Sequence, residues 1–250
     1  MAVSIKSARE IELMREAGKR LAHVHQELEA MIVPGIFTWE IDAKGEKLIR
    51  DCGCIPNFLH YNGYPASICV SVNDEVVHGI PRKDRYLKEG DIVSLDAGLI
   101  YKGYHSDAAR THAVGKVSTE AQKLMDVTKQ SFFEGIKMAK EGQHLHDISR
   151  AIEEYVTPYG YGIVRDLVGH GIGTALHEDP QIPNYAQKRR GVRLQAGMTL
   201  AIEPMINAGT WQVRFLRDGW TVVTKDGSLS AHYENTILVT DGEPEILTLY

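Results

Sequence analysis

Acidic residues in apolar, strand-like segments are the first features of this sequence that suggest chemistry. Asp96 lies in one such segment and Asp107 in the next. Lys102 and Gly103 between them suit a two-residue hairpin turn. Side chains alternate along a strand, so this register places Asp96 opposite Ala109 and both acids on one face. Two carboxylates facing each other in a sheet are costly unless something positive lies between them.

An internal repeat with few identities brings in a second pair of acids. A shift of 107 residues places Asp96 on Glu203, and a shift of 127 places Asp107 on Glu234. The extra 20 residues fit an insertion around positions 208–225. Chance alignment is an alternative, but the register that aligns two helices also aligns two carboxylates, which favours duplication.

Four carboxylates at one place would carry four negative charges, which two divalent cations balance. A two-metal site of this kind orients a substrate and lowers the pKa of a shared water. Carboxylate ligands with one imidazole and no thiolate suit Mn, Fe, Co or Zn. The alternative is that each acid ends its strand or pairs with Arg110, Arg214 or Arg217.

The best candidate for the imidazole ligand is His170. Its neighbours in Gly169-His170-Gly171-Ile172-Gly173 are small and allow close approach. A phosphate loop is rejected for this run, because no Lys-Ser/Thr pair follows it. His78 and His177 lie in similar turn settings, and with 11 histidines in the chain the residue type alone selects none.

Helices alternating with strands must position these residues. Ser7 and Glu10 form a capping box that starts the first helix. Periodicity and breakers predict further helices over 38–53, 118–140 and 147–156, and strands over 92–98, 104–111, 198–203 and 236–240. The pattern indicates a mixed α/β or α+β chain.

Composition excludes several classes of protein. The 250 residues carry a formal charge of −5, so no bulk attraction to nucleic acid or anionic membrane is expected. Three cysteines without metal-site spacing fit a reducing cytosol, and we expect a cytoplasmic protein. We find no signal-peptide core and no apolar stretch of membrane-spanning length.

The ordered acids and histidine resemble the metal ligands of a known enzyme family. Asp96, Asp107, His170, Glu203 and Glu234, with separations of 11, 63, 33 and 31, resemble the five ligands of the type I, bacterial-style methionine aminopeptidases. Other stretches similar to family motifs are Ser71-Val72-Asn73, His78-Gly79-Ile80-Pro81, Asp96-Ala97-Gly98, Gly169 to Gly173, His177-Glu178-Asp179-Pro180 and Ile202-Glu203-Pro204.

The resemblance implies an α+β fold of the pita-bread type. Two αβ halves related by a pseudo-two-fold axis, roughly 1–115 and 116–250, would surround a central antiparallel sheet within one catalytic domain over 1–250. The short spacing of the last two ligands favours type I over type II. No N-terminal zinc-binding extension is expected, and prolidase-like relatives add a domain for which this chain has no room.

The resemblance also implies a role for each metal ligand. Asp96 would chelate one divalent ion, His170 and Glu203 would hold the other, and Asp107 and Glu234 would bridge the two. Glu203 would also act as the proton shuttle for a shared water.

The two further histidines are implied to act on the substrate directly. His78 would contact the amide nitrogen of the scissile bond, and His177 would stabilise the oxyanion of the tetrahedral intermediate. One metal would bind the free α-amine, which restricts cleavage to an N-terminus. A monovalent cation is implied near Asn73, Glu75 and Ser230.

A methionine pocket needs an apolar, polarizable lining. Phe58 stands where some family members have Cys, and Leu176 where others have an aromatic residue, which leaves the shape of the pocket open. Cys69 would line the pocket and not act as a nucleophile. The residues implied to bind substrate are Phe58, Tyr61, Tyr64, Cys69, His78, His177 and Trp220.

The function implied is a metal-dependent aminopeptidase that removes the initiator methionine when the second residue is small. Its partners would be the N-terminal methionine of nascent polypeptides, near the ribosome, with no nucleic acid or membrane, and the enzyme would be a monomer. Two alternatives are a non-catalytic binding protein on the same fold and a dipeptidase or aminopeptidase P-like enzyme.

Overall fold

A computed structural model of the chain describes residues 3–249. The first helix, α1, spans Ala8–Glu29 and starts at the expected capping box. The Glu10 carboxylate accepts a hydrogen bond from the Ser7 backbone N–H at 2.7 Å, and the Ser7 hydroxyl accepts one from the Glu10 N–H. These bonds satisfy amides that a helix start leaves without partners.

The other three long helices lie close to the predicted ranges. They are α2 (Thr38–Asp51), α3 (Thr119–Ile136) and α4 (Leu145–Val156). The expected extension of the third helix to Lys140 is wrong: the helix ends at Ile136, and Lys140 forms a bridge with Thr240. The fourth helix begins two residues before Asp147, whose carboxylate instead accepts a hydrogen bond from the His144 backbone N–H at 3.1 Å.

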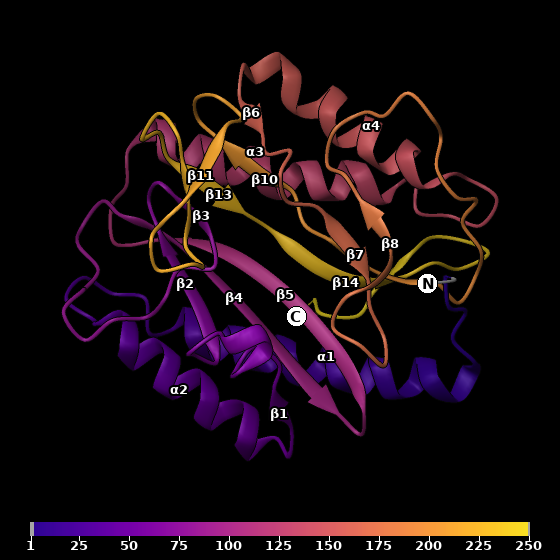
Figure 1. Ribbon diagram of the computed structural model, residues 1–250, viewed down its shortest axis with the longest axis horizontal. Helices are drawn as coiled ribbons and strands as arrows, with labels where there is room; N and C mark the ends of the chain where they lie inside the picture. The colour runs from indigo at the N-terminus through magenta and orange to yellow at the C-terminus, as the bar shows by residue number, and fades with distance from the viewer. Residues whose placement is uncertain (1–2, 250) are drawn as a thin grey trace.

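A nine-stranded antiparallel sheet forms the centre of the molecule (Figure 1). Its main path runs β1-β4-β5-β14-β9-β7-β8, with β2 paired to β4 and β15 to β14. The strand expected over 236–240 begins earlier, at Glu234. The bounds are β1 Ile55–Pro56, β2 Ile68–Val72, β4 Ile92–Tyr101, β5 Tyr104–Ala113, β7 Gly169–Gly171, β8 Glu178–Ile182, β9 Thr199–Ile202, β14 Glu234–Leu238 and β15 Glu245–Ile246.

Two small sheets complete the fold. One contains β6 (Gly162–Ile163), β10 (Met205–Asn207) and β13 (Ser230–His232), and the other β3 (Glu75–Val77), β11 (Val213–Phe215) and β12 (Val222–Thr224). The stretch expected as an insertion, 208–225, thus contains the β11–β12 hairpin, which pairs with β3.

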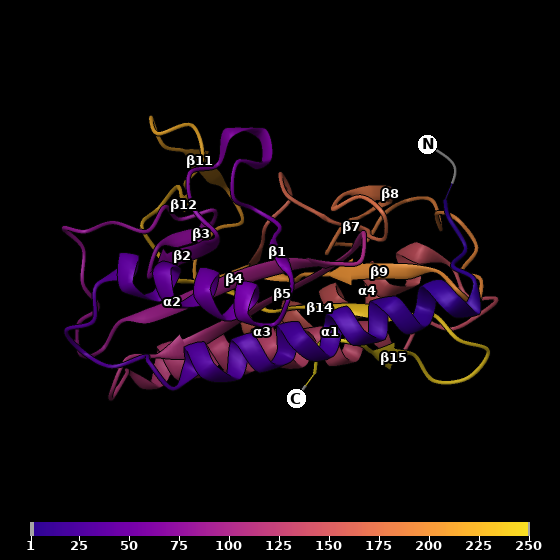
Figure 2. The same ribbon diagram turned by 90° about the horizontal axis from the view of Figure 1, so that it is seen from below.

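Because side chains alternate along each strand, the two faces of the main sheet carry different residues and different covering elements. Figure 2 shows α1 and α3 on one side of the main sheet and the β11–β12 hairpin on the other. Apolar side chains of β4 such as Val93 and Leu95 pack with Leu21 of α1 and Ile41 of α2. A second cluster packs Phe132 of α3 and Ile148 of α4 against β9 and β14. The opposite face of the sheet is therefore left for polar groups.

The helices form two pairs, α1 with α2 and α3 with α4, and each pair covers one half of the sheet (Figure 1). This agrees with the expected arrangement in two halves. The division of the chain near residue 115 stays a prediction. All three cysteines are unpaired. Over residues 3–249, no helix combines the length and apolar character needed to cross a bilayer.

His25 links α1 to the sheet in the apolar interior. Its side chain is fully buried, and Nε2 lies 2.8 Å from the backbone carbonyl of Ala108 in β5. Burial lowers the pKa of His25 well below its usual value, so the ring is neutral in the folded protein.

We therefore expect the free energy of unfolding to fall as the pH drops below about 6.5, where the unfolded chain binds a proton that folded His25 does not. His25→Gln should reduce this slope by up to about 1.4 kcal/mol per pH unit. Urea unfolding between pH 7.5 and 5 measures it. His23→Gln, at an exposed site on the same helix, is the control, and equal slopes in wild type and His25→Gln would contradict the assignment.

Candidate metal centre and active-site pocket

The β4–β5 hairpin has the register that the sequence predicts. Asp96 pairs with Ala109, and Asp107 with Gly98. Ala109 in turn pairs with Glu234 of β14, so Asp96 and Glu234 flank a small side chain in one cross-strand row. The methyl group of Ala109 leaves open space between the two carboxylates.

The remaining two candidate ligands come from the other half of the sheet. Glu203 directly follows β9, and His170 of β7 pairs with Ala201 of β9. Nε2 of His170 lies 3.6 Å from Oε1 of Glu203 and 4.0 Å from Oδ2 of Asp107. Asp107, His170 and Glu234 each offer one donor atom, and these three atoms lie within 4.8 Å of one another. Five predicted ligands from four strands and one strand end thus converge.

Burial makes the charges of these acids costly. Asp96 is 9% exposed, Asp107 5% and Glu234 2%. Burial raises the pKa of Asp96 to about 7. It also raises the pKa of Asp107, Glu203 and Glu234 well above the usual values, with the neighbouring carboxylates adding to the effect.

Arginine pairing does not explain the cluster. Arg214 and Arg217 are exposed, whereas the acids are enclosed. Arg110 lies on the helix side of β5, donates to the backbone carbonyl of Glu234, and donates to Oδ1 of Asn235 at 2.5 Å. It therefore holds the strand that carries Glu234 by its backbone.

The donor set fits divalent cations. Asp96 Oδ1, Asp107 Oδ1 and Glu234 Oε1 are buried and have no hydrogen-bond partner within the described residues. Buried carboxylate oxygens without partners are rare and unfavourable unless a cation binds them. Carboxylates with one imidazole and no thiolate are ligands for Mn, Fe, Co or Zn.

His170 is held with one nitrogen directed at the acids. Its Nδ1 lies 2.8 Å from the carbonyl oxygen of Gly171, which can only accept, so Nδ1 carries the proton. Burial lowers the pKa of His170 to about 3, which keeps the ring neutral. Nε2 therefore presents its lone pair to the carboxylates, as a metal ligand requires.

His78 and His177 lie at the same pocket. His78 has a left-handed backbone, with φ of 58°, a strained conformation of the kind that clusters at functional sites. Burial lowers its pKa to about 4. The His177 and His170 ring centroids are 4.3 Å apart, and Nδ1 of His177 lies 2.8 Å from the Tyr61 hydroxyl.

A cavity of about 270 Å³ joins these groups. The Tyr64 ring packs edge-on against Trp220, with centroids 5.2 Å apart, and its hydroxyl donates to the carbonyl of Gly79 at 2.9 Å. Cys69 pairs with Asp96 across β2 and β4, and burial raises the pKa of its thiol, so the thiolate is disfavoured. Every predicted site residue lines the cavity: Phe58, Tyr61, Tyr64, Cys69, His78, Asp96, Asp107, His170, Leu176, His177, Glu203, Trp220 and Glu234.

The residues suggested for a monovalent cation also lie together. The Ser230 backbone N–H donates to the Asn73 carbonyl at 2.9 Å, and Asn73 has a left-handed backbone with φ of 59°. The cation itself stays a prediction.

Two polar residues close to the acids were missed in the sequence. Asn184 is fully buried and its Nδ2 donates to the Glu203 carbonyl at 3.0 Å. His232 is 1% exposed, with Nε2 3.7 Å from Glu203 Oε2 and 3.9 Å from Glu234 Oε2. The internal repeat is the signal that points to His232, since the shift of 127 that places Asp107 on Glu234 also places His105 on His232.

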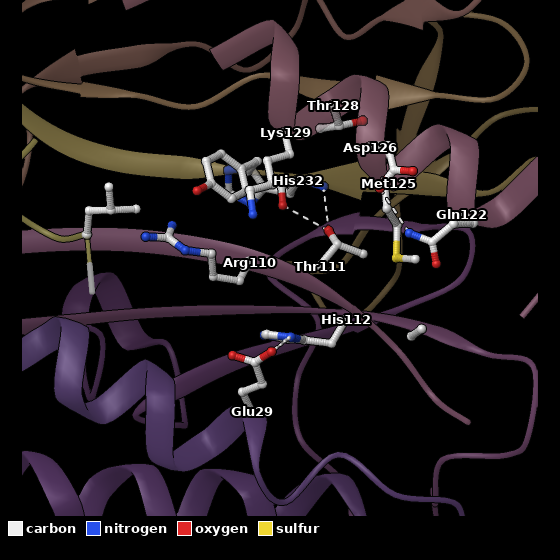
Figure 3. Close-up of a pocket in the computed structure, with 13 residues that line it drawn as sticks. Glu29, Arg110, Thr111, His112, Gln122, Met125, Asp126, Thr128, Lys129 and His232 are labelled. Carbon is white, nitrogen blue, oxygen red and sulfur yellow. Dashed lines mark hydrogen bonds and ion pairs between the residues drawn. The ribbon is translucent and has the colours of Figure 1, made fainter. Parts of the chain in front are cut away.

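A second cavity, of about 420 Å³, lies on the helix side of β5 (Figure 3). None of the predicted site residues lines it. Among the residues that line it, His112 Nδ1 lies 3.8 Å from Glu29 Oε1, and the Arg110 guanidinium lies 4.6 Å from the Tyr233 ring centroid. The acids and the predicted substrate residues belong to the smaller cavity.

Comparison with known proteins agrees with this geometry. The model of metallopeptidase family M24 matches residues 12–241. A methionine aminopeptidase of Clostridium acetobutylicum is 54% identical over 247 residues, which cover 99% of each chain. Another, named methionine aminopeptidase 1, from Bacillus subtilis is 51% identical and covers 97% of this chain and 98% of its own.

Solved structures give the same result. The crystal structure of a methionine aminopeptidase from Thermotoga maritima is 47% identical, covers all of both chains and has a TM-score of 0.97. It confirms the pita-bread architecture that the sequence predicts. The region that the family model matches contains the four acids and His170. This chain therefore belongs to metallopeptidase family M24.

Proposed function

We propose that this protein removes the N-terminal methionine from nascent proteins and peptides whose second residue is small, using divalent metal ions. The observation that carries the proposal is the convergence of five donor groups in one cavity whose other lining residues include Phe58, Leu176 and Trp220. The names of relatives that are at least half identical over nearly the whole chain support the same activity.

The order of strands in the sheet supports the division of ligands between two ions. The sequence β4-β5-β14-β9-β7 puts Asp96 at one end and His170 at the other. Asp107 and Glu234 lie on the strands between them, where bridging carboxylates are needed. When bound, such ions lower the pKa of water and balance the four acids. Co, Mn, Fe and Zn all suit these ligands.

Glu203 is the residue we assign to proton transfer. It sits at the end of β9, its side chain is 13% exposed, and it is the acid closest to His170. A carboxylate at the mouth of the cluster can take a proton from water and return it to the leaving amine.

His78 and His177 are assigned to the scissile bond. Both are neutral and both line the cavity beside the acids. His177 would donate to the oxyanion, where charge develops in the transition state, and His78 would contact the amide nitrogen.

The apolar part of the cavity is assigned to the methionine side chain. Phe58 and Leu176 are buried in one cluster with Tyr64 and Cys69, and Tyr61 and Trp220 pack against it. A thioether makes favourable contacts with aromatic rings of this kind. The free α-amine would then face the acids.

The remaining assignments concern the surroundings of the enzyme. A monovalent cation near Asn73 and Ser230, a monomeric state, a cytoplasmic location and a position near the ribosome are proposed with the same activity.

The activity is tested directly with Met-Ala-Ser. The protein loaded with Mn²⁺ or Co²⁺ should release methionine, dialysis against a chelator should stop the reaction, and restored metal should recover it. N-acetyl-Met-Ala-Ser should stay intact, because it lacks the free amine. Chromatography of the products measures each result. Folded, metal-loaded protein that leaves Met-Ala-Ser intact but cuts X-Pro bonds would refute the proposal.

Glu203→Gln should lower kcat by at least about 100-fold, because the amide cannot accept a proton. Metal affinity should fall as well, since a ligand is changed. Steady-state kinetics and Co²⁺ titration measure the two effects, with Glu154→Gln, an exposed acid on α4, as the control. A kcat within a few-fold of wild type would remove Glu203 from proton transfer.

His177→Ala should lower kcat by about 100-fold and change KM little, because an oxyanion donor acts mainly in the transition state. The kinetics of Met-Ala-Ser cleavage separate the two constants, and His23→Ala serves as the control at an exposed site. A variant with near wild-type kcat would show that His177 has no part in the mechanism.

A further inference from the structure

His232 is a buried imidazole for which the proposed reaction has no role. It is 1% exposed, and neither Nδ1 nor Nε2 has a hydrogen-bond partner within the described residues. Buried polar side chains in folded proteins nearly always have partners, so a ring with two unpaired nitrogens calls for an explanation.

The backbone of His232 is fixed from both sides. The Thr111 hydroxyl donates to the His232 carbonyl at 2.8 Å and accepts from the His232 N–H at 2.9 Å (Figure 3). The hydroxyls of Thr111 and Ser94 are 2.8 Å apart, and His232 pairs with Met205 across β13 and β10. This anchoring restricts the direction in which the ring extends.

The ring extends toward two of the acids. Nε2 lies 3.7 Å from Glu203 Oε2 and 3.9 Å from Glu234 Oε2, within ion-pair distance of both acids but beyond the hydrogen-bond range of about 2.7 to 3.2 Å. His232 does not line the substrate cavity, so it lies behind these acids and not beside a substrate.

The chemistry of the contact follows from what Nε2 faces. Each nitrogen of an imidazole presents either an N–H or a lone pair. Carboxylates that bind metal are anionic acceptors, so the N–H, and not the lone pair, is complementary to Glu203 and Glu234 at Nε2.

We propose that His232 is a positioning residue of the metal centre, whose Nε2–H donates to the carboxylates of Glu203 and Glu234 and orients their metal-binding oxygens. Partners of this kind around metal ligands commonly contribute 10- to 100-fold in metal affinity or activity. The inference rests on the metal centre proposed above.

A matched pair of amide variants tests whether the donor atom must lie at the position of His232 Nε2. The amide nitrogen of Gln can occupy the position of Nε2, whereas that of Asn corresponds to Nδ1 and falls short. His232→Asn should weaken Co²⁺ binding by about 10-fold or more in calorimetry. His232→Gln should recover most of the affinity. His105→Asn, two residues before Asp107, is the control and should bind Co²⁺ like wild type.

Two results would overturn the proposal. One is wild-type Co²⁺ affinity in His232→Asn, and the other is an equal loss in Asn and Gln variants, as packing or direct metal ligation by His232 predicts. Failure of the wild-type protein itself to bind Co²⁺ would instead refute the metal centre, which separates the two questions.

A measurement on the unaltered protein does not depend on whether a variant folds. In protein with ¹⁵N-labelled histidine and bound Zn²⁺, the His232 signal, assigned by its loss in His232→Gln, should show a proton on Nε2. A metal-bound or unprotonated Nε2 would refute donation to the acids.

Discussion

Mutual repulsion among four enclosed carboxylates is the interaction on which the rest of this structure depends. Burial raises the pKa of all four acids, and neighbouring carboxylates add to the effect at Asp107, Glu203 and Glu234, so the site favours protons or cations over free anions. The sheet does not relieve this by spacing the acids apart, because only the methyl group of Ala109 lies between Asp96 and Glu234 in their row. Positive charge is therefore favoured among the four acids, and divalent cations would supply it.

The helix side of the sheet makes this arrangement possible. Val93 and Leu95 of β4 are buried among the residues of α1 and α2, while Asp96 points the other way. A slip of one residue in strand register would exchange these faces and place an acid in the apolar core. The large apolar clusters thus fix the register of the strands, and the register fixes where the acids meet.

The sequence predicted local geometry well, and it indicated long-range geometry only through the internal repeat and a family resemblance. A two-residue turn and the alternation of side chains were enough to predict that Asp96 faces Ala109. His170 was favoured among 11 histidines for its small glycine neighbours, and the resemblance implied the same ligand. Its position beside the acids depends on the pairing of β7 with β9, a contact between distant segments that no local pattern predicts. The third helix ends at Ile136, and Lys140 forms a bridge with Thr240, a contact between distant segments that helix propensity cannot predict. His232 was not chosen as a site residue, although the repeat aligns it with His105, two residues before an acid.

Hydrogen bonding explains why residue type could not rank the histidines. Three neutral imidazoles lie at this centre, and they differ in the surroundings of Nδ1. The Gly171 carbonyl fixes the proton of His170 on Nδ1 and leaves a lone pair for metal. For His177 the partner is the Tyr61 hydroxyl, and a phenol that donates to Nδ1 leaves Nε2–H free to donate to an oxyanion. His232 has no partner at Nδ1, so its single proton can reside on Nε2, facing the acids. The roles proposed for these side chains, as ligand, donor or support, thus differ with the partner that each Nδ1 has.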